Sequence, residues 1–407
     1  MKLLSFLGTG NYRPVTYRLG EKELETEYVV EALYSFLEPD EVVVFVTEEA
    51  MKTHGEKLKE RIPVRFVPIE VPRKQEDVWG IFEAIVESVG EGESIALDIT
   101  HAFRHIPFLA FPALLYLVEM KNVDVRGIYY GAFEAREETE SGIKAPIFEL
   151  TGLLEAIEWL YGLRDLKLYG RAEGLSDAIR KTNARIHRSG AGERPKVLSR
   201  YSGLLRSLST LLHLNQVPAF MELAGRSEKD LDDFRREAVR FLPPLRYSLG
   251  EVEKLTSFGC SSGHCLEEAV ELTGYMLEKG LVANALELER ELIVNVVLAR
   301  LGVEDYLSRD NRVRAERTIG WFAGKVRGMK GLEKTEWVGK LEGWELIDEL
   351  ARAWLKVSEV RNAIAHAGMK PEEDRPQPKT IIKAAKEVFE TLRKVVNATV
   401  RSDEDKS

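Results

Sequence analysis

Cysteine is scarce in this sequence: Cys260 and Cys265 are the only two among 407 residues, and His264 lies between them. A tetrahedral zinc site needs four cysteine, histidine or carboxylate ligands, and two cysteines with one histidine cannot complete it. We therefore expect no metal site. A redox pair stays an alternative for the two cysteines, and the sequence assigns them no role.

Long hydrophobic runs are also missing. A membrane-spanning helix needs about 20 consecutive apolar residues, and no stretch of this sequence reaches that length. The chain opens on a strand-like segment, Lys2–Leu7, and lacks the charged, apolar and cleavage regions of a signal peptide. We expect a cytoplasmic protein with no membrane partner.

Positive charge is in deficit overall. The 58 lysine and arginine residues face 67 aspartate and glutamate residues, so the net charge is −9. This balance argues against broad nucleic-acid binding through a uniformly basic surface, and contacts with phosphate must use local clusters. Two basic stretches qualify, at 180–206 and 309–330, although solvated helix faces often have the same composition.

Internal repeats and low-complexity tracts are absent as well, and the glycine-rich loop Gly8–Pro14 is neither a GxGxxG nor a Walker A sequence. A chain of 407 residues is too long for one hydrophobic core. The sequence divides into parts at residues 1–150, 151–262 and 263–401, with a disordered tail at 402–407.

The first 150 residues alternate between strand and helix patterns. Strands are expected at 2–7, 42–46, 64–71, 94–99, 124–133 and 145–150, and helices at 26–37, 76–89 and 103–120. The strands are almost uniformly apolar, which is typical of a mainly parallel sheet covered by helices on both faces. The fold class predicted for this part is therefore α/β.

Strand patterns end at about Thr151. Helical pieces continue to about residue 255, and they predict an all-α connector or inserted domain, within which a small helix-turn-helix is an open alternative. The last part is also helical, with helices expected at 266–279, 281–301, 312–326, 344–367 and 379–400.

Polar side chains interrupt the apolar pattern at 98–105, where a strand gives way to a helix. Ligands of open α/β sheets bind at the carboxyl ends of strands, and a helix N-terminus there attracts an anion. Thr100 would cap this helix and Arg104 would project from its first turn, which favours a phosphate site. The loop Gly8–Pro14 leaves another strand end and would line the same crevice. A structural interpretation stays open, in which Thr100 only caps and Asp98 only holds the turn.

A second site is predicted near the end of the helix at 344–367. Its apolar stripe continues onto Arg361, and an arginine on a buried face needs a partner or a cavity. His366 follows five residues later, so both side chains would border one groove. Arginine stabilises a phosphate in its transition state and histidine moves protons near neutral pH, which suits metal-free RNA cleavage by the ribose 2′-hydroxyl. A salt bridge and a helix-dipole contact are the alternative roles.

Two motifs resemble one known family. The segment Leu97–Arg104, LDITHAFR, resembles the D-x-T-H-G motif of CRISPR-associated Rossmann-fold (CARF) domains, with Ala102 in place of glycine. The segments at 8–12, 47–50 and 129–133 look like the same subfamily. Arg361–His366, RNAIAH, resembles the R-x4-6-H signature of HEPN ribonucleases. The resemblance covers about the first 150 and the last 130 residues.

The resemblance implies an α/β Rossmann-like CARF domain at 1–150, then an all-α connector and an all-α HEPN domain at 263–401. It implies an ancillary effector of type III CRISPR antiviral defence that forms a homodimer or a higher even-numbered oligomer. Cyclic oligoadenylate, with cyclic tetra-adenylate as the expected ring, would activate cleavage of single-stranded RNA that leaves a 2′,3′-cyclic phosphate. No cofactor besides this activator is implied.

The resemblance also implies roles for single residues. The ligand contacts would be Thr9, Gly10, Asn11, Thr100, His101 and Arg104. Arg361 and His366 would carry cleavage, and Asn362 would orient them. Two alternatives stay open: a ring nuclease that degrades cyclic oligoadenylate in the CARF crevice, and a nucleotide-sensing regulator that binds DNA through arginines of the 180–206 cluster.

Overall fold

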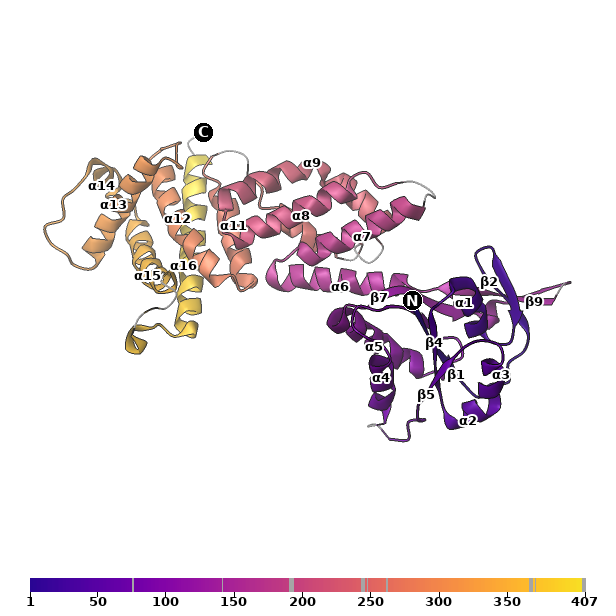
Figure 1. Cartoon of the computed structure of the whole chain (residues 1–407). Helices are drawn as coiled ribbons and strands as arrows, with labels where there is room; N and C mark the ends of the chain where they lie inside the picture. The colour runs from indigo at the N-terminus through magenta and orange to yellow at the C-terminus, as the bar shows by residue number, and fades with distance from the viewer. Residues whose placement is uncertain are drawn as a thin grey trace. The chain divides into compact units, whose positions relative to one another are not determined.

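The computed structural model describes residues 1–74, 77–140, 142–189, 194–242, 246, 248–260, 263–365, 369 and 371–404. The chain forms two compact units, Met1–Ala156 and Ile157–Ser407. Strands and helices build the first unit, whereas the described part of the second unit consists of helices (Figure 1). The predicted fold class, a mainly parallel α/β part followed by all-α parts, is confirmed.

Five parallel strands form the centre of the sheet in the first unit. In spatial order they are β5 (Arg65–Pro68), β4 (Glu41–Val46), β1 (Lys2–Leu7), β6 (Ser94–Asp98) and β7 (Asp124–Gly131). The chain continues to one side of β1 to form β4 and later returns to the other side to form β6. The loops after β1 and β6 therefore leave the same edge of the sheet at the point where the strand order reverses.

Beyond β7 the sheet is mixed. Strand β9 (Gly142–Glu149) pairs antiparallel with β7, and the short β8 (Glu137–Thr139) pairs with β9. Strands β2 (Val15–Leu19) and β3 (Lys22–Thr26) form a hairpin whose first strand joins β9 in parallel. The sequence pattern missed this hairpin and placed a helix from residue 26. The strands are short and partly exposed, so they lack the continuous apolar run that predicted the central strands.

Helices cover both faces of the sheet. One face packs α1 (Val29–Leu37), α2 (Glu48–Ala50), a π-helix at Met51–Gly55 and α3 (Glu56–Lys59), and the other face packs α4 (Val78–Glu87) and α5 (Ile106–Lys121). Leu3 belongs to the first of these cores and Leu4 to the second, because successive residues of a strand point to opposite faces. The expectation of a sheet buried on both sides is thus met.

The second unit is built from a long series of helices. They are α6 (Gly152–Tyr169, which begins in the first unit), α7 (Glu173–Ser189), α8 (Leu198–His213), α9 (Val217–Phe241), α10 (Leu249–Thr256), α11 (Leu266–Glu278), α12 (Val282–Arg300), α13 (Arg309–Val326), α14 (Glu336–Leu341), α15 (Ile347–Ala365) and α16 (Pro378–Glu404). Helix α16 continues to Glu404, although the sequence predicted a disordered tail from residue 402.

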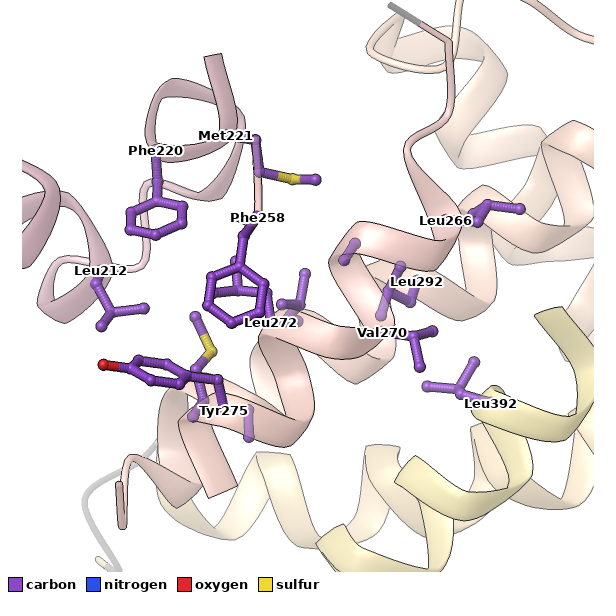
Figure 2. Close-up of a cluster of buried hydrophobic side chains, with 14 of the residues drawn as sticks. Leu212, Phe220, Met221, Phe258, Leu266, Val270, Leu272, Tyr275, Leu292 and Leu392 are labelled. Carbon is purple, nitrogen blue, oxygen red and sulfur yellow. The ribbon is translucent and has the colours of Figure 1, made fainter. Parts of the chain in front are cut away.

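One continuous hydrophobic core joins the helices of the second unit. Figure 2 shows part of it, where Phe258 and Tyr275 lie beside Leu212 of α8, and their ring centroids are 5.2 Å apart. The same core includes Leu292 of α12 and Leu392 of α16. Buried side chains from both sides of residue 262 share this core, and the predicted division between 151–262 and 263–401 stays a prediction.

A disulfide joins Cys260 and Cys265 immediately before α11. Among the described residues, no group of three or more histidine, cysteine, aspartate and glutamate side chains is arranged to hold a metal ion. A search of the described helices finds none with both the length and the apolar character of a membrane span.

Candidate functional site

A cavity of about 530 Å³ opens where β1, β6 and β7 end. Its walls come from the loop after β1, the loop after β6, the end of β7 with the residues that follow, and the β2 and β8–β9 strands. The lining residues are Asn11, Tyr12, Arg13, Tyr17, Glu27, Thr100, His101, Tyr130, Gly131, Phe133, Glu134, Arg136, Glu138 and Ile143. The two loops therefore line one crevice, as expected, at the position where open α/β sheets bind ligands.

Thr100 ties the end of β6 to the end of β7. Its hydroxyl donates to Asp98 Oδ1 at 2.6 Å and accepts from the Gly131 N–H at 2.8 Å. The prediction that Thr100 caps the next helix is wrong, because α5 begins only at Ile106 and its cap position is His105. Hydrogen bonds to the ends of β6 and β7, and not a contact with a helix, fix the position of the Thr100 side chain.

Asp98 is fully buried beneath this turn. Its Oδ1 also accepts from the Thr100 N–H at 2.9 Å, and its Oδ2 accepts from the Ser5 hydroxyl at 2.7 Å. Burial raises the pKa of Asp98, and the hydrogen bonds from Thr100 and Ser5 offset part of that rise. The carboxyl group holds the turn, as the structural interpretation expects, and joins β1 to β6 under the cavity.

His101 covers the start of α1. Its Nε2 accepts from the Val29 N–H at 3.3 Å, while the residue in the cap position, Tyr28, makes no such side-chain bond. Burial, with a smaller contribution from the charge of His54, lowers the pKa of His101 to about 3. The imidazole is therefore neutral at pH 7, and an accepting Nε2 leaves the proton on Nδ1.

Tyr12 lies between two imidazole rings. Its ring centroid is 4.1 Å from that of His101 and 4.6 Å from that of His54, and its hydroxyl accepts from the Gly8 N–H at 3.0 Å. Burial raises the pKa of Tyr12 to about 12, so the phenol stays protonated. The ring contacts of Tyr12 and its hydrogen bond with Gly8 thus help to hold the loop after β1.

His54 is a residue that sequence reasoning missed. Its Nε2 lies 2.8 Å from the Gly10 carbonyl and its Nδ1 lies 3.1 Å from the Tyr28 hydroxyl. It belongs to the π-helix Met51–Gly55, and single π-helical turns occur frequently at functional sites. No short sequence motif joins His54 to a loop that lies 44 residues away.

Charged groups of both signs line the cavity, whereas the sequence predicted a site for phosphate alone. Arg13 and Arg136 supply two cations, and Arg136 lies 4.6 Å from the centroid of the Phe133 ring. Three carboxylates, including Glu134, face them, and Glu134 accepts from the Tyr130 hydroxyl at 2.8 Å. Arginines, aromatic faces and acceptors together suit a nucleotide, whose phosphates and bases need different partners.

The remaining predicted ligand residues are not among those that line the cavity. Thr9 and Gly10 are exposed in the same loop as Asn11, and Arg104 is exposed in the turn before α5. The two loops also touch through their backbones: a Cβ atom at Gly8 would lie 2.9 Å from the His101 carbonyl oxygen. Glycine at this position is what allows the close approach.

The second predicted site lies on α15. Arg361 is one-third exposed and forms an ion pair with Glu287 of α12, with Nε 3.1 Å from Oε1 and Nη2 3.3 Å from Oε2. The arginine therefore has the partner that its position requires. Asn362 is exposed. His366 lies outside the described residues, so its expected place beside Arg361 stays a prediction.

Two family models match separate parts of the chain. Residues 2–78 match the CARF domain of the CRISPR system endoribonuclease Csx1, and residues 155–257 match the second domain of CRISPR-associated protein MJ1674. CRISPR-associated protein MJ1674 of Methanocaldococcus jannaschii is 30% identical over 186 residues, which are 44% of this chain and 27% of that protein. The chain is thus similar to CRISPR-associated proteins, and its first residues are similar to a CARF domain. The resemblance to CARF proteins is thereby confirmed, the resemblance of Arg361–His366 to HEPN ribonucleases stays a prediction, and we call Met1–Ala156 the CARF unit.

A solved structure of Enterococcus italicus Csm6 bound to cyclic hexa-2'-fluoro-hexa-dAMP was also matched, with a TM-score of 0.37 and 14% identity over 98% of this chain and 93% of that one. A likeness of this size supports no conclusion about the site. The match to the Csx1 CARF domain covers β1 and its loop, whereas Thr100, His101 and the end of β7 lie beyond residue 78. The family match does not cover these residues, and the pairing of β6 and β7 in the sheet places them in the cavity.

Proposed function

We propose that the chain is a CARF-regulated ribonuclease of type III CRISPR defence, in which cyclic oligoadenylate binds the CARF unit and the helical unit cleaves single-stranded RNA. The observation that carries the proposal is the cavity at the reversal of strand order, in the unit that matches a CARF family model. Its rings and arginines suit adenine bases and phosphates.

The ligand contacts follow from this cavity. Asn11, Thr100 and His101 line it. Thr9 and Gly10, in the same loop as Asn11, and Arg104, in the turn before α5, would be contacted by a ring that extends beyond the cavity. A ring made of identical nucleotides suits a two-fold axis, because each copy of the chain then meets the same chemical groups. Cyclic tetra-adenylate is the ring we expect.

Cleavage in the helical unit would proceed without metal. The ribose 2′-hydroxyl attacks the adjacent phosphorus, the 5′-oxygen leaves with a proton, and the products carry a 2′,3′-cyclic phosphate and a 5′-hydroxyl. Arg361 would stabilise the negative charge that grows on the phosphate, Asn362 would orient the site, and His366 would act in proton transfer or as a donor.

An exposed apolar surface of the CARF unit supports the homodimer. Phe108 on α5 is 83% exposed and Leu153 is 52% exposed, and both border an almost wholly apolar hollow of about 390 Å³. Exposed apolar surface of this kind is typical of an interface. The substitution Phe108→Asp should shift a dimer toward monomer in sedimentation experiments, while Glu119→Asp on the same helix should not.

The decisive experiment incubates labelled single-stranded RNA with the full chain and cyclic tri-, tetra- or hexa-adenylate, with and without a chelator. Cleavage that requires one ring, persists in chelator and leaves a cyclic phosphate supports the proposal. Arg361→Ala and His366→Ala should abolish cleavage and retain ring binding. Cleavage of RNA in none of these mixtures would contradict it.

The two alternative functions have less support. Ring cleavage in the CARF unit would need a free nucleophile or base, but the Thr100 hydroxyl is engaged by Asp98 and Gly131, and His101 Nε2 is engaged by Val29. Within the basic stretch at 180–206, acidic side chains pair with Arg180, Arg200 and Arg206. Such pairing weakens a phosphate-binding surface for DNA.

A further inference from the structure

The ion pair between Arg361 and Glu287 determines which part of the guanidinium faces a substrate. The carboxylate occupies one edge, formed by Nε and Nη2, at 3.1 and 3.3 Å. A guanidinium carries five N–H donors in a rigid plane. Holding one edge fixes the plane of the group and leaves both hydrogens of Nη1 and the outer hydrogen of Nη2 directed away from the carboxylate.

Glu287 is well placed to hold another side chain still. It lies on α12, which packs against α11, α13, α15 and α16, and its neighbours Leu286 and Leu288 are buried. The helix therefore cannot shift without disturbing the core of the unit. A catalytic group needs this kind of rigid support, because a small displacement from the reacting atoms lowers the rate strongly.

Charge gives Glu287 a second effect. In the proposed dimer two copies of Arg361 approach the same RNA, and two uncompensated cations in one groove would repel each other. A carboxylate beside each arginine offsets part of this repulsion while no RNA is bound. It does so on the edge of the guanidinium that the phosphate does not use.

We propose that Glu287 is the positioning residue of the ribonuclease site, which holds Arg361 in the orientation that stabilises the transition state. The inference rests on the proposed function of Arg361. It differs from the opposite interpretation, in which Glu287 masks the arginine and keeps the enzyme inactive until the ring binds.

The same helix offers a matched control. Glu291 lies one turn after Glu287, pairs with Arg312 and Arg290, and its side chain is 41% exposed, against 38% for Glu287. Removing the carboxylate charge breaks one partly exposed ion pair at Glu287 and two at Glu291. A purely structural effect should therefore be at least as large in Glu291→Gln as in Glu287→Gln.

The test measures kcat and KM for RNA in the full chain, at saturating cyclic tetra-adenylate and below the melting temperature of every variant. Wild-type cleavage and its loss in Arg361→Ala come first, and failure at this step counts against the proposed function itself. With that step passed, Glu287→Gln should lower kcat about 10- to 100-fold with little change in KM. Glu287→Asp should restore part of the rate, and Glu291→Gln should keep the wild-type kcat.

Two results would overturn the inference in an active enzyme. One is a kcat for Glu287→Gln that equals that of Glu291→Gln. The other is cleavage by Glu287→Gln in the absence of the ring, because a masking carboxylate, unlike a positioning one, restrains activity until it is removed.

Discussion

The CARF unit and the helical unit hold their polar residues in different ways. In the CARF unit, Asp98, Thr100 and His101 are parts of the framework, because they join strand ends and cover the start of a helix. In the helical unit, Arg361 is attached through one partly exposed ion pair. A substitution in the first site should therefore change stability and binding together, whereas one in the second should change chemistry alone.

The largest effect is expected at a buried carboxyl group of the helical unit, on the same helix as Glu287. Glu289 on α12 is fully buried, both its carboxyl oxygens lack a hydrogen-bond partner among the described residues, and burial raises its pKa to about 9. The folded chain thus keeps a proton that the unfolded chain loses above pH 4.5, and stability falls as pH rises toward 9. Glu289→Gln should remove this fall, with a gain of about 5 kcal/mol at pH 9 relative to pH 5.

Unfolding in urea at several pH values measures this gain. Glu291→Gln, which changes an exposed carboxylate of the same helix, serves as the control and should show no comparable dependence. Parallel pH profiles of Glu289→Gln and the wild type would show that Glu289 reaches a partner in solution.

The next effect is expected at Asp98 in the CARF unit. Asp98→Ala leaves the Ser5 hydroxyl and two Thr100 donors without their acceptor, and should cost about 3 kcal/mol of stability. Hydrogen exchange of β1 and β6 should accelerate, and ring binding should weaken in the same variant. Asp124→Ala, at an exposed carboxylate, is the control. If ring binding is lost while hydrogen exchange in β1 and β6 stays at the wild-type rate, Asp98 acts on the binding site and not on the stability of the strands.

His101 should give a smaller effect with the opposite pH dependence. The pKa of His101 is lowered to about 3 in the folded chain. Between pH 6.5 and 3 the imidazole is therefore protonated in the unfolded chain and neutral in the folded chain, so the free energy of unfolding decreases as the pH falls through this range. His101→Ala should remove this contribution and cost about 1 kcal/mol at pH 7 through the loss of the α1 cap. Urea unfolding at pH 7 and pH 5 measures it. An equal cost at both pH values would contradict this account.

The smallest effect on stability should come from the second site. Arg361→Ala removes an ion pair between side chains that are 33% and 38% exposed, and should change stability by less than about 1 kcal/mol. Thermal melting measures this, and binding of cyclic tetra-adenylate to the CARF unit should stay at the wild-type level. A large loss of stability would show that both sites belong to the framework of their units.

The sequence predicted what depends on short apolar strands and on helical periodicity. The central strands followed from the former, the helices α11 to α13 and α15 followed from the latter, and the meeting of the loops after β1 and β6 followed from the rule for strand ends. The β2–β3 hairpin did not, because its strands are short and partly exposed. The strand-to-helix pattern placed Thr100 in the crevice, where the structure has it, but its prediction of a helix cap was wrong. A threonine before a helix does not reveal from the sequence that it will bond to a neighbouring strand.

Partners that are distant in sequence escaped prediction for a different reason. His54 holds the loop after β1 from a π-helix, and Glu287 holds Arg361 across 74 residues. Both contacts form only when helices pack against other parts of the fold, and no residue spacing in the sequence predicts them. The apolar stripe that continues onto Arg361 predicted that the arginine needs a partner or a cavity. It could not name the partner, because α12 by itself contains Glu287, Glu289 and Glu291 in three different environments.

The close approach of Gly8 to the His101 carbonyl has a consequence for how this protein can change over time. A side chain added at Gly8 would collide with the His101 carbonyl, so substitutions in the loops after β1 and β6 constrain one another during evolution. Related proteins that differ in ligand preference should therefore differ mainly in the β2–β3 hairpin and in the residues after β7, and the two touching loops should change together.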